Sequence, residues 1–232
     1  MNIPIVTKEQ AQKVDDLAVN HYGIEIIQMM ENASRNTAFL AKQILGDVKG
    51  KKILILAGKG NNGGDGIVAG RFLHNWGADI SIILAEIHGK LTELTKKQLR
   101  ILKAMDVDII YPSDIKYEEL KGDLIIDGIL GYNINRNPAE TYAKLIEFAN
   151  DSGTHILSID VPSGLDPETG KPYTPCIKAK TTLCLANVKK GCVEGRKYAG
   201  DIYVADIGLP PELYEMLELK AERMEKDIIK FT

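Results

Sequence analysis

The segment 57–66, which reads A-G-K-G-N-N-G-G-D-G, holds the residues with the clearest chemical potential. Three of its glycines fit the pattern G-x-G-x-x-G, directly after the apolar run 53–56 and before a helical pattern at 67–76. This context is typical of a dinucleotide-binding loop, because glycines let the backbone approach a phosphate and the free N–H groups of the following helix attract it. The pattern predicts a strand-to-helix loop that holds a nucleotide-like ligand.

The polar side chains of this loop indicate more than phosphate binding. Asp65 would repel a phosphate, whereas two neighbouring amides, Asn61 and Asn62, add hydrogen-bonding groups to the same turn. Asn62-Gly63 is also a signal for a hairpin, but a helical pattern follows it and not a second strand. We therefore expect a polar site at this loop. Glu86, about 20 residues further on, is a candidate for the acid that binds a ribose.

Two further carboxylates, Asp127 and Asp160, stand where apolar runs end. A single such residue often only caps a helix or forms a turn. Ligands of open parallel sheets, however, bind at the carboxyl ends of the strands, so these two ends can face the same crevice as the first loop. Asn62, Asp127 and Ser163 offer oxygen ligands, which suit an alkali or alkaline-earth cation and not zinc. With one formal charge among them, a monovalent ion is easier to accommodate.

Acid–base chemistry fits the remaining reactive groups better than metal or nucleophilic catalysis. No two of the four histidines stand at metal-ligand spacing: they are His21, His74, His88 and His155. Ser163 lacks the G-x-S-x-G frame of a nucleophile elbow, which argues against a hydrolase. Proton transfer by Asp160 or Asp65 is the preferred hypothesis.

Short runs rich in Ile, Leu and Val must position these residues, and they read as buried strands: 53–56, 80–84, 108–111, 124–126, 156–159, 182–186 and 202–205. Helical patterns separate several of them, which predicts an α/β fold: a Rossmann-like, doubly wound, mostly parallel sheet with helices on both faces. Residues 1–48 read as a helical segment packed on this core. A last helix starts at Pro210-Pro211, and the charged tail 220–230 reads as a solvated face. We expect one domain over 1–232.

Composition excludes several classes of function. The 232 residues are 44% hydrophobic and carry 29 basic and 32 acidic side chains, a net charge of -3 that favours no nucleic acid. No apolar stretch approaches the roughly 20 residues of a membrane span, and no leader pattern opens the chain, so we expect a cytoplasmic protein that binds no membrane. Three cysteines without C-x-x-C spacing are expected to be reduced thiols.

Several segments together resemble one known family, the YjeF N-terminal domain or NAD(P)H-hydrate epimerases. The motifs that carry the resemblance are G-N-N-G-G-D-G at 60–66, M-E-N-A at 30–33, D-G-I-L-G at 127–131, D-V-P-S-G-L-D at 160–166, K-K-G at 189–191 and D-I-G-L-P at 206–210. They occur in order over nearly the whole chain. The N-N-G-G-D-G element is far more specific than a generic glycine pattern.

The resemblance implies a Rossmann-like fold and an isomerase that interconverts the R and S forms of hydrated NADH or NADPH, in which a hydroxyl is attached to C6 of the nicotinamide ring. It also implies a bound potassium ion, held by Asn62, Asp127 and Ser163. The substrate would contact two loops and one acid: Asn61, Asn62, Gly63, Gly64 and Asp65; Gly131, Tyr132, Asn133, Ile134, Asn135, Arg136 and Asn137; and Asp160. A homodimer and a separate NAD(P)H-hydrate dehydratase are the implied partners.

A mechanism can be stated as a hypothesis. An acid protonates the C6 hydroxyl, the electrons of the ring nitrogen expel water, and water returns to the other face. Asp160, aided by Asp65, is the candidate for these proton transfers. The sequence departs from the family pattern at Ser34, where glycine is usual, and in the loop 131–138, which lacks the usual G-x-G-F-x-G form. Arg136 is a candidate for a different phosphate contact.

Two other functions remain open on the sequence. A nicotinamide-dependent oxidoreductase is suggested by the glycine pattern and Glu86, although Asp65 and the lack of a second substrate domain count against it. A non-catalytic nucleotide-binding or scaffolding module of the same fold is suggested by the altered loop 131–138.

Overall fold

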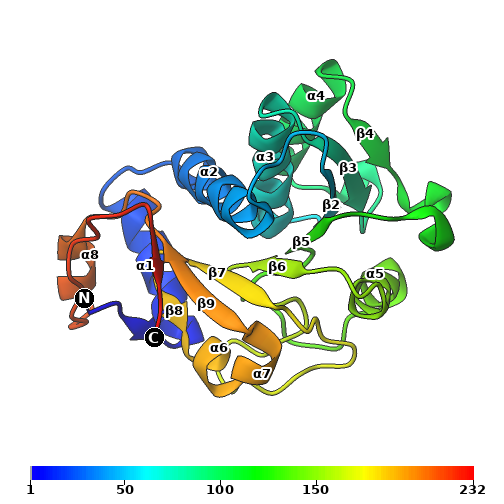
Figure 1. Cartoon of the computed structure of the whole chain (residues 1–232). Helices are drawn as coiled ribbons and strands as arrows, with labels where there is room; N and C mark the ends of the chain where they lie inside the picture. Colours follow the sequence, from blue (N-terminus) through cyan, green and yellow to red (C-terminus); the bar gives the residue numbers. More distant parts are fainter. Residues whose placement is uncertain (1) are drawn as a thin grey trace.

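One eight-stranded sheet forms the centre of this computed structural model, which describes residues 2–232 (Figure 1). Its strands in chain order are β2 (Lys52–Ala57), β3 (Asp79–Leu84), β4 (Asp108–Ile110), β5 (Leu124–Gly128), β6 (Ile156–Ile159), β7 (Thr181–Leu185), β9 (Asp201–Ala205) and β10 (Ile228–Lys230). In space they follow the order β10-β9-β7-β6-β5-β2-β3-β4. Every neighbouring pair is parallel except β9 and β10. The predicted doubly wound, mostly parallel sheet is confirmed.

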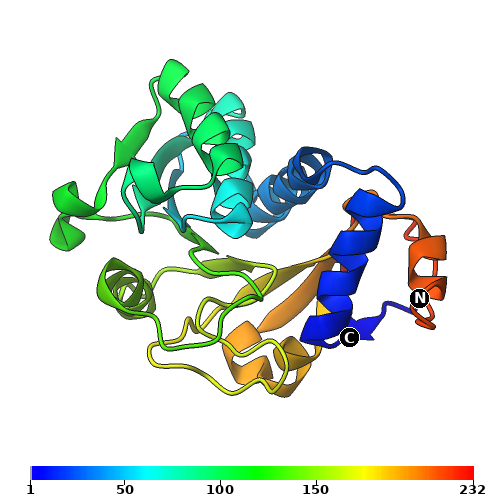
Figure 2. The ribbon, with the colours of Figure 1, turned by 180° about the vertical axis from the view of Figure 1, so that it is seen from behind.

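Helices lie on both faces of the sheet, as the view from behind also shows (Figure 2). They are α1 (Lys8–Asn20), α2 (Ile26–Leu45), α3 (Asn61–Asn75), α4 (Glu93–Ala104), α5 (Glu140–Asp151), α6 (Lys190–Glu194), α7 (Arg196–Ala199) and α8 (Pro211–Glu215), with 3-10 turns at His88–Lys90, Pro112–Asp114 and Tyr117–Glu119. Alternate residues of β2 pack against opposite faces of the sheet. Ile53 and Ile55 pack in the core with α2, α3 and α4, whereas Leu54 and Leu56 pack with α5. This period of two is what a strand buried on both faces requires.

The N-terminal segment is not wholly helical, which corrects the prediction for 1–48. Two β-branched residues form β1 (Ile5–Val6), which pairs in parallel with β8 (Val188–Lys189). The register places Val6 beside Lys189. Thr7 then caps α1 through a capping box with Gln10. The chain therefore enters α1 from a strand that is anchored to a distant part of the sequence.

The C-terminal tail also differs from the prediction. The predicted last helix is present as the short α8 and most of the tail 220–230 is exposed as predicted, but residues 228–230 form the edge strand β10, which was not predicted. Ile228 pairs with Ala205 and Lys230 with Tyr203. A three-residue strand within a charged tail leaves too little alternation for its pattern to be read from sequence.

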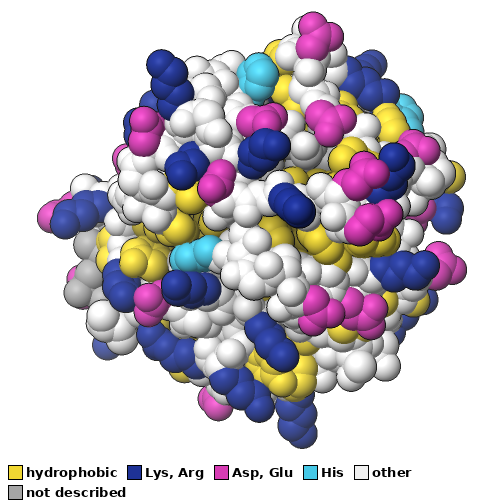
Figure 3. Space-filling model, turned by 45° about the vertical axis from the view of Figure 1, so that its right-hand side comes forward, with side chains coloured by type: hydrophobic (Ala, Val, Ile, Leu, Met, Phe, Trp, Pro, Cys, Tyr) yellow, Lys and Arg dark blue, Asp and Glu magenta, His cyan; other side chains and the backbone are white. Residues whose placement is uncertain are grey.

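On the face shown in Figure 3, basic and acidic side chains are interspersed over the surface. In residues 2–232 no helix is both long enough and apolar enough to span a bilayer. The three cysteines are free and buried, as expected for reduced thiols.

Candidate active site

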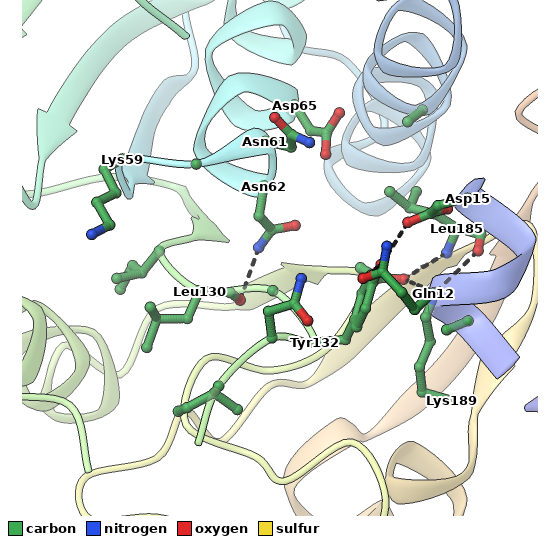
Figure 4. Close-up of a pocket in the computed structure, with 18 of the residues that line it drawn as sticks. Gln12, Asp15, Lys59, Asn61, Asn62, Asp65, Leu130, Tyr132, Leu185 and Lys189 are labelled. Atoms are coloured by element: carbon green, nitrogen blue, oxygen red, sulfur yellow. Dashed lines mark hydrogen bonds and ion pairs between the residues drawn. The ribbon is translucent and has the colours of Figure 1, made fainter. Parts of the chain in front are cut away.

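The order of the sheet reverses between β2 and β5, which lie side by side although α3, β3, α4 and β4 separate them in sequence. The carboxyl ends of strands at such a switch point form the usual ligand crevice of a doubly wound sheet. A cavity of about 1100 Å³ opens here. It receives residues from the start of α3, from the ends of β5 and β6, and from α1, α2 and β8 (Figure 4).

The N-N-G-G-D-G motif lies inside a helix and not in a loop, which corrects the sequence-based boundary. Gly60 is extended and α3 begins at Asn61, so the motif forms the first turns of the helix. Glycine is required because backbones touch: a Cβ at Gly63 would lie 2.0 Å from the carbonyl oxygen of Gly58. This close packing fixes where Asn62 and Asp65 leave the helix.

Asp127 is fully buried at the end of β5 and receives four hydrogen bonds. Its Oδ1 accepts from the backbone N–H of Ile129 at 3.2 Å and from Ser163 Oγ at 2.5 Å. Its Oδ2 accepts from Ser158 Oγ at 2.7 Å and from the backbone N–H of Ser163 at 2.9 Å. Burial raises the pKa of Asp127, and the donors from Ser163, Ser158 and Ile129 oppose that rise.

The three predicted ion ligands, Asn62, Asp127 and Ser163, form one group. Asn62 and Ser163 both contact the carbonyl oxygen of Leu130, and Asp127 is linked to them through Ser163. Asn62 Nδ2 donates to this carbonyl oxygen at 2.9 Å, and Ser163 Oγ lies 3.2 Å away from it. The amide oxygen of Asn62 turns away from Leu130 (Figure 4). We call Asn62, Asp127, Leu130 and Ser163 the oxygen cluster. Within the described residues, no group of three or more His, Cys, Asp or Glu side chains could hold a metal ion, so any cation here would depend on the single Asp127 carboxylate together with amide, hydroxyl and carbonyl oxygens.

Asp160 lies directly after β6 and forms a buried ion pair with Lys189 of β8. Its backbone is left-handed, with φ 65°, a conformation that Asp tolerates better than most residues. Its Oδ1 accepts from Lys189 Nζ and, at 3.2 Å, from the backbone N–H of Leu185. Burial alone would lower the pKa of Lys189, but the charge and hydrogen bond of Asp160, together with Cys184 and Asp15, outweigh burial and the pKa is raised. The pair therefore favours the charged form of Lys189.

Asp65 lies across the cavity in a different environment. It is 7% exposed, and its carboxyl receives no hydrogen bond from any residue of the described chain. Burial, and then the charges of Asp160 and Asp15, raise the pKa of Asp65 well above its ordinary value. This environment favours the protonated, neutral form of the side chain.

Asp15 of α1 reaches the same cavity and is one of the residues that sequence reasoning missed. Tyr132 Oη donates to its Oδ2 at 2.6 Å, and the Tyr132 ring lies 5.6 Å from Lys189 Nζ. We call Asp15, Asp65, Asp160 and Lys189 the acid cluster. Asn187 was also missed: it lines the cavity, is 2% exposed, and its Oδ1 has no partner among the described residues. Neither stands in a pattern that a sequence motif would identify.

The loop 131–137, which departs from the family pattern, lines the cavity along its whole length. The family pattern has glycines in this loop, whereas here side-chain contacts hold the loop in place. Lys8 Nζ donates to the Ile134 carbonyl at 3.2 Å, and Asn137 Oδ1 accepts from the Thr174 N–H at 3.0 Å. With the bond between Tyr132 and α1, three separate contacts hold the loop. Arg136 is exposed at the cavity.

The predicted site residues thus meet in one place. Asn61, Asn62 and Asp65 line the cavity together with all of 131–137 and with Asp160, whereas Gly63 and Gly64 are buried in the helix beneath it. Asp127 and Ser163 lie in the oxygen cluster behind the lining. Glu86 also lines the cavity and pairs with Lys90 at 3.5 Å.

Residues 26–191 match the sequence family described as YjeF-related protein N-terminus. The chain belongs to this family. The match to the YjeF family includes α3, the oxygen cluster and the Asp160–Lys189 pair, but β1 and α1 precede it.

Relatives in the YjeF family carry related names. The NAD(P)H-hydrate epimerase of Dehalogenimonas lykanthroporepellens is 36% identical over 93% of this chain and 86% of its own length. That of Elusimicrobium minutum is 33% identical over 90% of this chain and 97% of its own length. The bifunctional NAD(P)H-hydrate repair enzyme Nnr of Dictyoglomus turgidum is 32% identical over 97% of this chain, which spans 45% of that relative.

A solved structure confirms the fold of this YjeF-family chain. The crystal structure of yeast ynu0 superposes with a TM-score of 0.84, covering 99% of this chain and 100% of the yeast chain at 24% identity.

Proposed function

We propose that this protein is an NAD(P)H-hydrate epimerase, which interconverts the R and S forms of hydrated NADH or NADPH. The observation that carries the proposal is the opposite environment of two carboxyl groups at one cavity. Burial and neighbouring carboxylates raise the pKa of Asp65, whereas the Asp160 carboxyl is ion-paired with Lys189. A general acid and a general base need this difference. The names of the relatives support the choice of substrate.

In the proposed reaction, Asp65 protonates the C6 hydroxyl of the hydrated ring. The C6–O bond breaks as the electron pair of the ring nitrogen forms a double bond to C6, and water leaves. Water then adds to the opposite face, the electron pair returns to nitrogen, and Asp160 takes the released proton. Return of that proton to Asp65 restores the starting state. The sequence hypothesis placed Asp160 first; we exchange the two roles because both carboxyls are buried but only Asp160 is paired with Lys189.

We propose that the oxygen cluster holds a potassium ion. The chemistry of the donor set fits: Asp127, Leu130 and Ser163 offer carboxylate, carbonyl and hydroxyl oxygens, which are ligands for hard cations. Asn62 would add its amide oxygen after the side-chain amide, which donates to Leu130 through its nitrogen, turns over. A positive ion would also offset the cost of burying the Asp127 carboxylate, which has no cationic partner within residues 2–232. When bound, the ion would stabilise the two strand ends that support the cavity.

The cavity also suggests how the nucleotide is oriented. Lys59 lies at the end opposite Asp15 and Lys189 (Figure 4), close to the first N–H groups of α3, which favour anions. We assign the phosphates to this end, with Arg136 as an additional contact, and the ring to the end that carries the acid cluster. The contacts to 61–65 and 131–137 follow from this orientation.

The proposal extends to partners and compartment. A dehydratase that consumes one epimer is the proposed functional partner, and the name of two relatives, bifunctional NAD(P)H-hydrate repair enzyme, supports a second repair activity alongside this one. A homodimer is proposed from the family resemblance alone. The free, buried cysteines fit a reducing compartment such as the cytoplasm.

A coupled assay tests the proposed function. Hydrated NADH, produced by heat or acid, is supplied with an excess of a stereospecific dehydratase and potassium. We expect the protein to accelerate consumption of the epimer that the dehydratase leaves, and Asp65→Asn to lose this effect. Asp114→Asn, an equal change of charge at an exposed site, is the matched control. No acceleration by the wild type would reject the epimerase; hydride transfer to carbonyl substrates would favour an oxidoreductase, and binding without turnover a non-catalytic module.

A further inference from the structure

Asp15 lines the cavity from a helix that lies outside the family match, and nothing in the proposed proton transfers uses it. Its oxygen is 2.6 Å from Tyr132 Oη, a separation typical of a hydroxyl that donates to an ionised carboxylate. Burial raises the pKa of Asp15, while the Tyr132 hydrogen bond and Lys189 oppose that rise. The geometry therefore provides a second carboxylate that is held in place and has a dedicated donor.

The charges around Asp15 are unbalanced. The charged and titratable groups that face it come from its own helix, from α3, from the end of β6, from β8 and from the loop 131–137: Asp16, Asp65, Asp160, Lys189 and Tyr132. Lys189 is the one cation of the acid cluster, and its positive charge is already compensated by the ion pair with Asp160. Asp15 thus leaves a net negative charge at this end of the cavity.

We propose that Asp15, oriented by Tyr132, stabilises the positively charged ring that forms when the C6 hydroxyl leaves. This inference rests on the proposed epimerase reaction, in which the neutral hydrate becomes a cation before water returns. A fixed carboxylate in a partly buried site lowers the energy of a cation more than that of a neutral ring. Asp65 and Asp160 change protonation during the reaction, whereas Asp15 keeps its charge throughout.

Ring charge can be tested without turnover. NAD+ and NADH have nearly the same shape, but only the oxidised ring is cationic. We expect wild-type protein to bind NAD+ more tightly than NADH by calorimetric titration at low salt, and Asp15→Asn to reduce this preference about tenfold. Glu9→Gln removes the same charge from an exposed site on the same helix, and should leave the preference unchanged.

Kinetics give a second readout. The cation is absent from the substrate, so Asp15→Asn should lower kcat about tenfold or more and leave KM nearly unchanged. Tyr132→Phe removes the donor and raises the pKa of Asp15 further. In that variant the preference for NAD+ should therefore weaken as the pH falls towards 6 and return at higher pH. Since burial of the Asp15 charge costs stability, Asp15→Asn should remain folded, which circular dichroism checks.

The outcomes separate this inference from the proposed function. If the wild type epimerises hydrated NADH but Asp15→Asn keeps the NAD+ preference, the role of Asp15 is wrong and the epimerase stands. If kcat falls but Glu9→Gln lowers it equally, the effect is one of overall charge and the inference also fails. If the wild type shows no epimerisation in the coupled assay, both are rejected.

Discussion

The oxygen cluster and the acid cluster lie at the same edge of the sheet, and both contain buried carboxyl groups. The two clusters surround these carboxyl groups with different partners. Asp127 is surrounded by four neutral donors. Asp160 forms an ion pair with Lys189, whereas Asp65 has neither a hydrogen-bond donor nor an ion-pair partner among the described residues. A carboxylate with neutral donors and no counter-charge can accept a cation, a paired one can act as base, and an unsupported one tends to keep its proton. We therefore propose three different roles for these three aspartates.

The largest expected effect comes from Asp160→Asn, which removes the charge partner of buried Lys189. We expect kcat/KM to fall about 10³–10⁴-fold and the free energy of unfolding to fall by about 3–5 kcal/mol. The coupled assay and urea unfolding measure these two effects. Adding Lys189→Met should restore most of the stability without activity. A single variant as stable as the wild type would show that the pair contributes nothing to folding.

Asp65→Asn should lower kcat about 10²–10³-fold while raising stability at neutral pH. The native pKa of Asp65 lies above its unfolded value, so the native state binds more protons between these two values. Wild-type stability therefore falls as pH rises through that window, and the variant escapes the loss. Urea unfolding between pH 5 and 8 should show the variant's advantage growing with pH. An advantage that is constant with pH would mean that Asp65 is not protonated in the native state.

Asp127→Asn should remove the response to potassium with a smaller loss of activity, about tenfold. In the wild type, replacing potassium with tetramethylammonium at constant ionic strength should lower both activity and Tm, because the ion binds only the folded state. The variant should show the same Tm in both salts. Equal Tm shifts in variant and wild type would place the ion elsewhere.

The smallest effect is expected at Arg136, which lies outside both clusters. Arg136→Gln should raise KM about threefold with kcat unchanged, because an exposed cation adds little to phosphate binding in water. Arg100→Gln, exposed and outside the cavity lining, is the control. A large fall in kcat would instead place Arg136 close to the reacting ring.

Much of the sheet could be read from sequence because its strands are continuous apolar runs, such as Ile53 to Leu56, that stay buried on both faces. Strand ends then located Asp127 and Asp160. Three short strands were missed, since β1 and β8 have two residues each, β10 has three, and all have little pattern of their own. The start of α3 was placed too late because glycines oppose a helix by propensity, and close backbone packing overrides that preference here.

The acid cluster was only half predictable. Asp65 and Asp160 stand in motifs, but Asp15 occupies an ordinary amphipathic helix, where one carboxylate resembles any other solvated residue. Its role depends on the contact with Tyr132, 117 positions away in the sequence. A contact of that range comes from tertiary packing alone, and so does the difference between Asp160, which is paired with Lys189, and Asp65, which has no ion pair among the described residues.

The pairing of β1 with β8 bears on where this protein can be cut. Val6 lies beside Lys189, and α1, which follows directly, supplies Asp15. A fragment trimmed to the family match at 26–191 would keep the glycine motif and the oxygen cluster. It would lose both the strand that supports the cavity lysine and the helix that faces it. We therefore expect the unit of function to be wider than the family match, and affinity tags to be better tolerated at the other end of the chain.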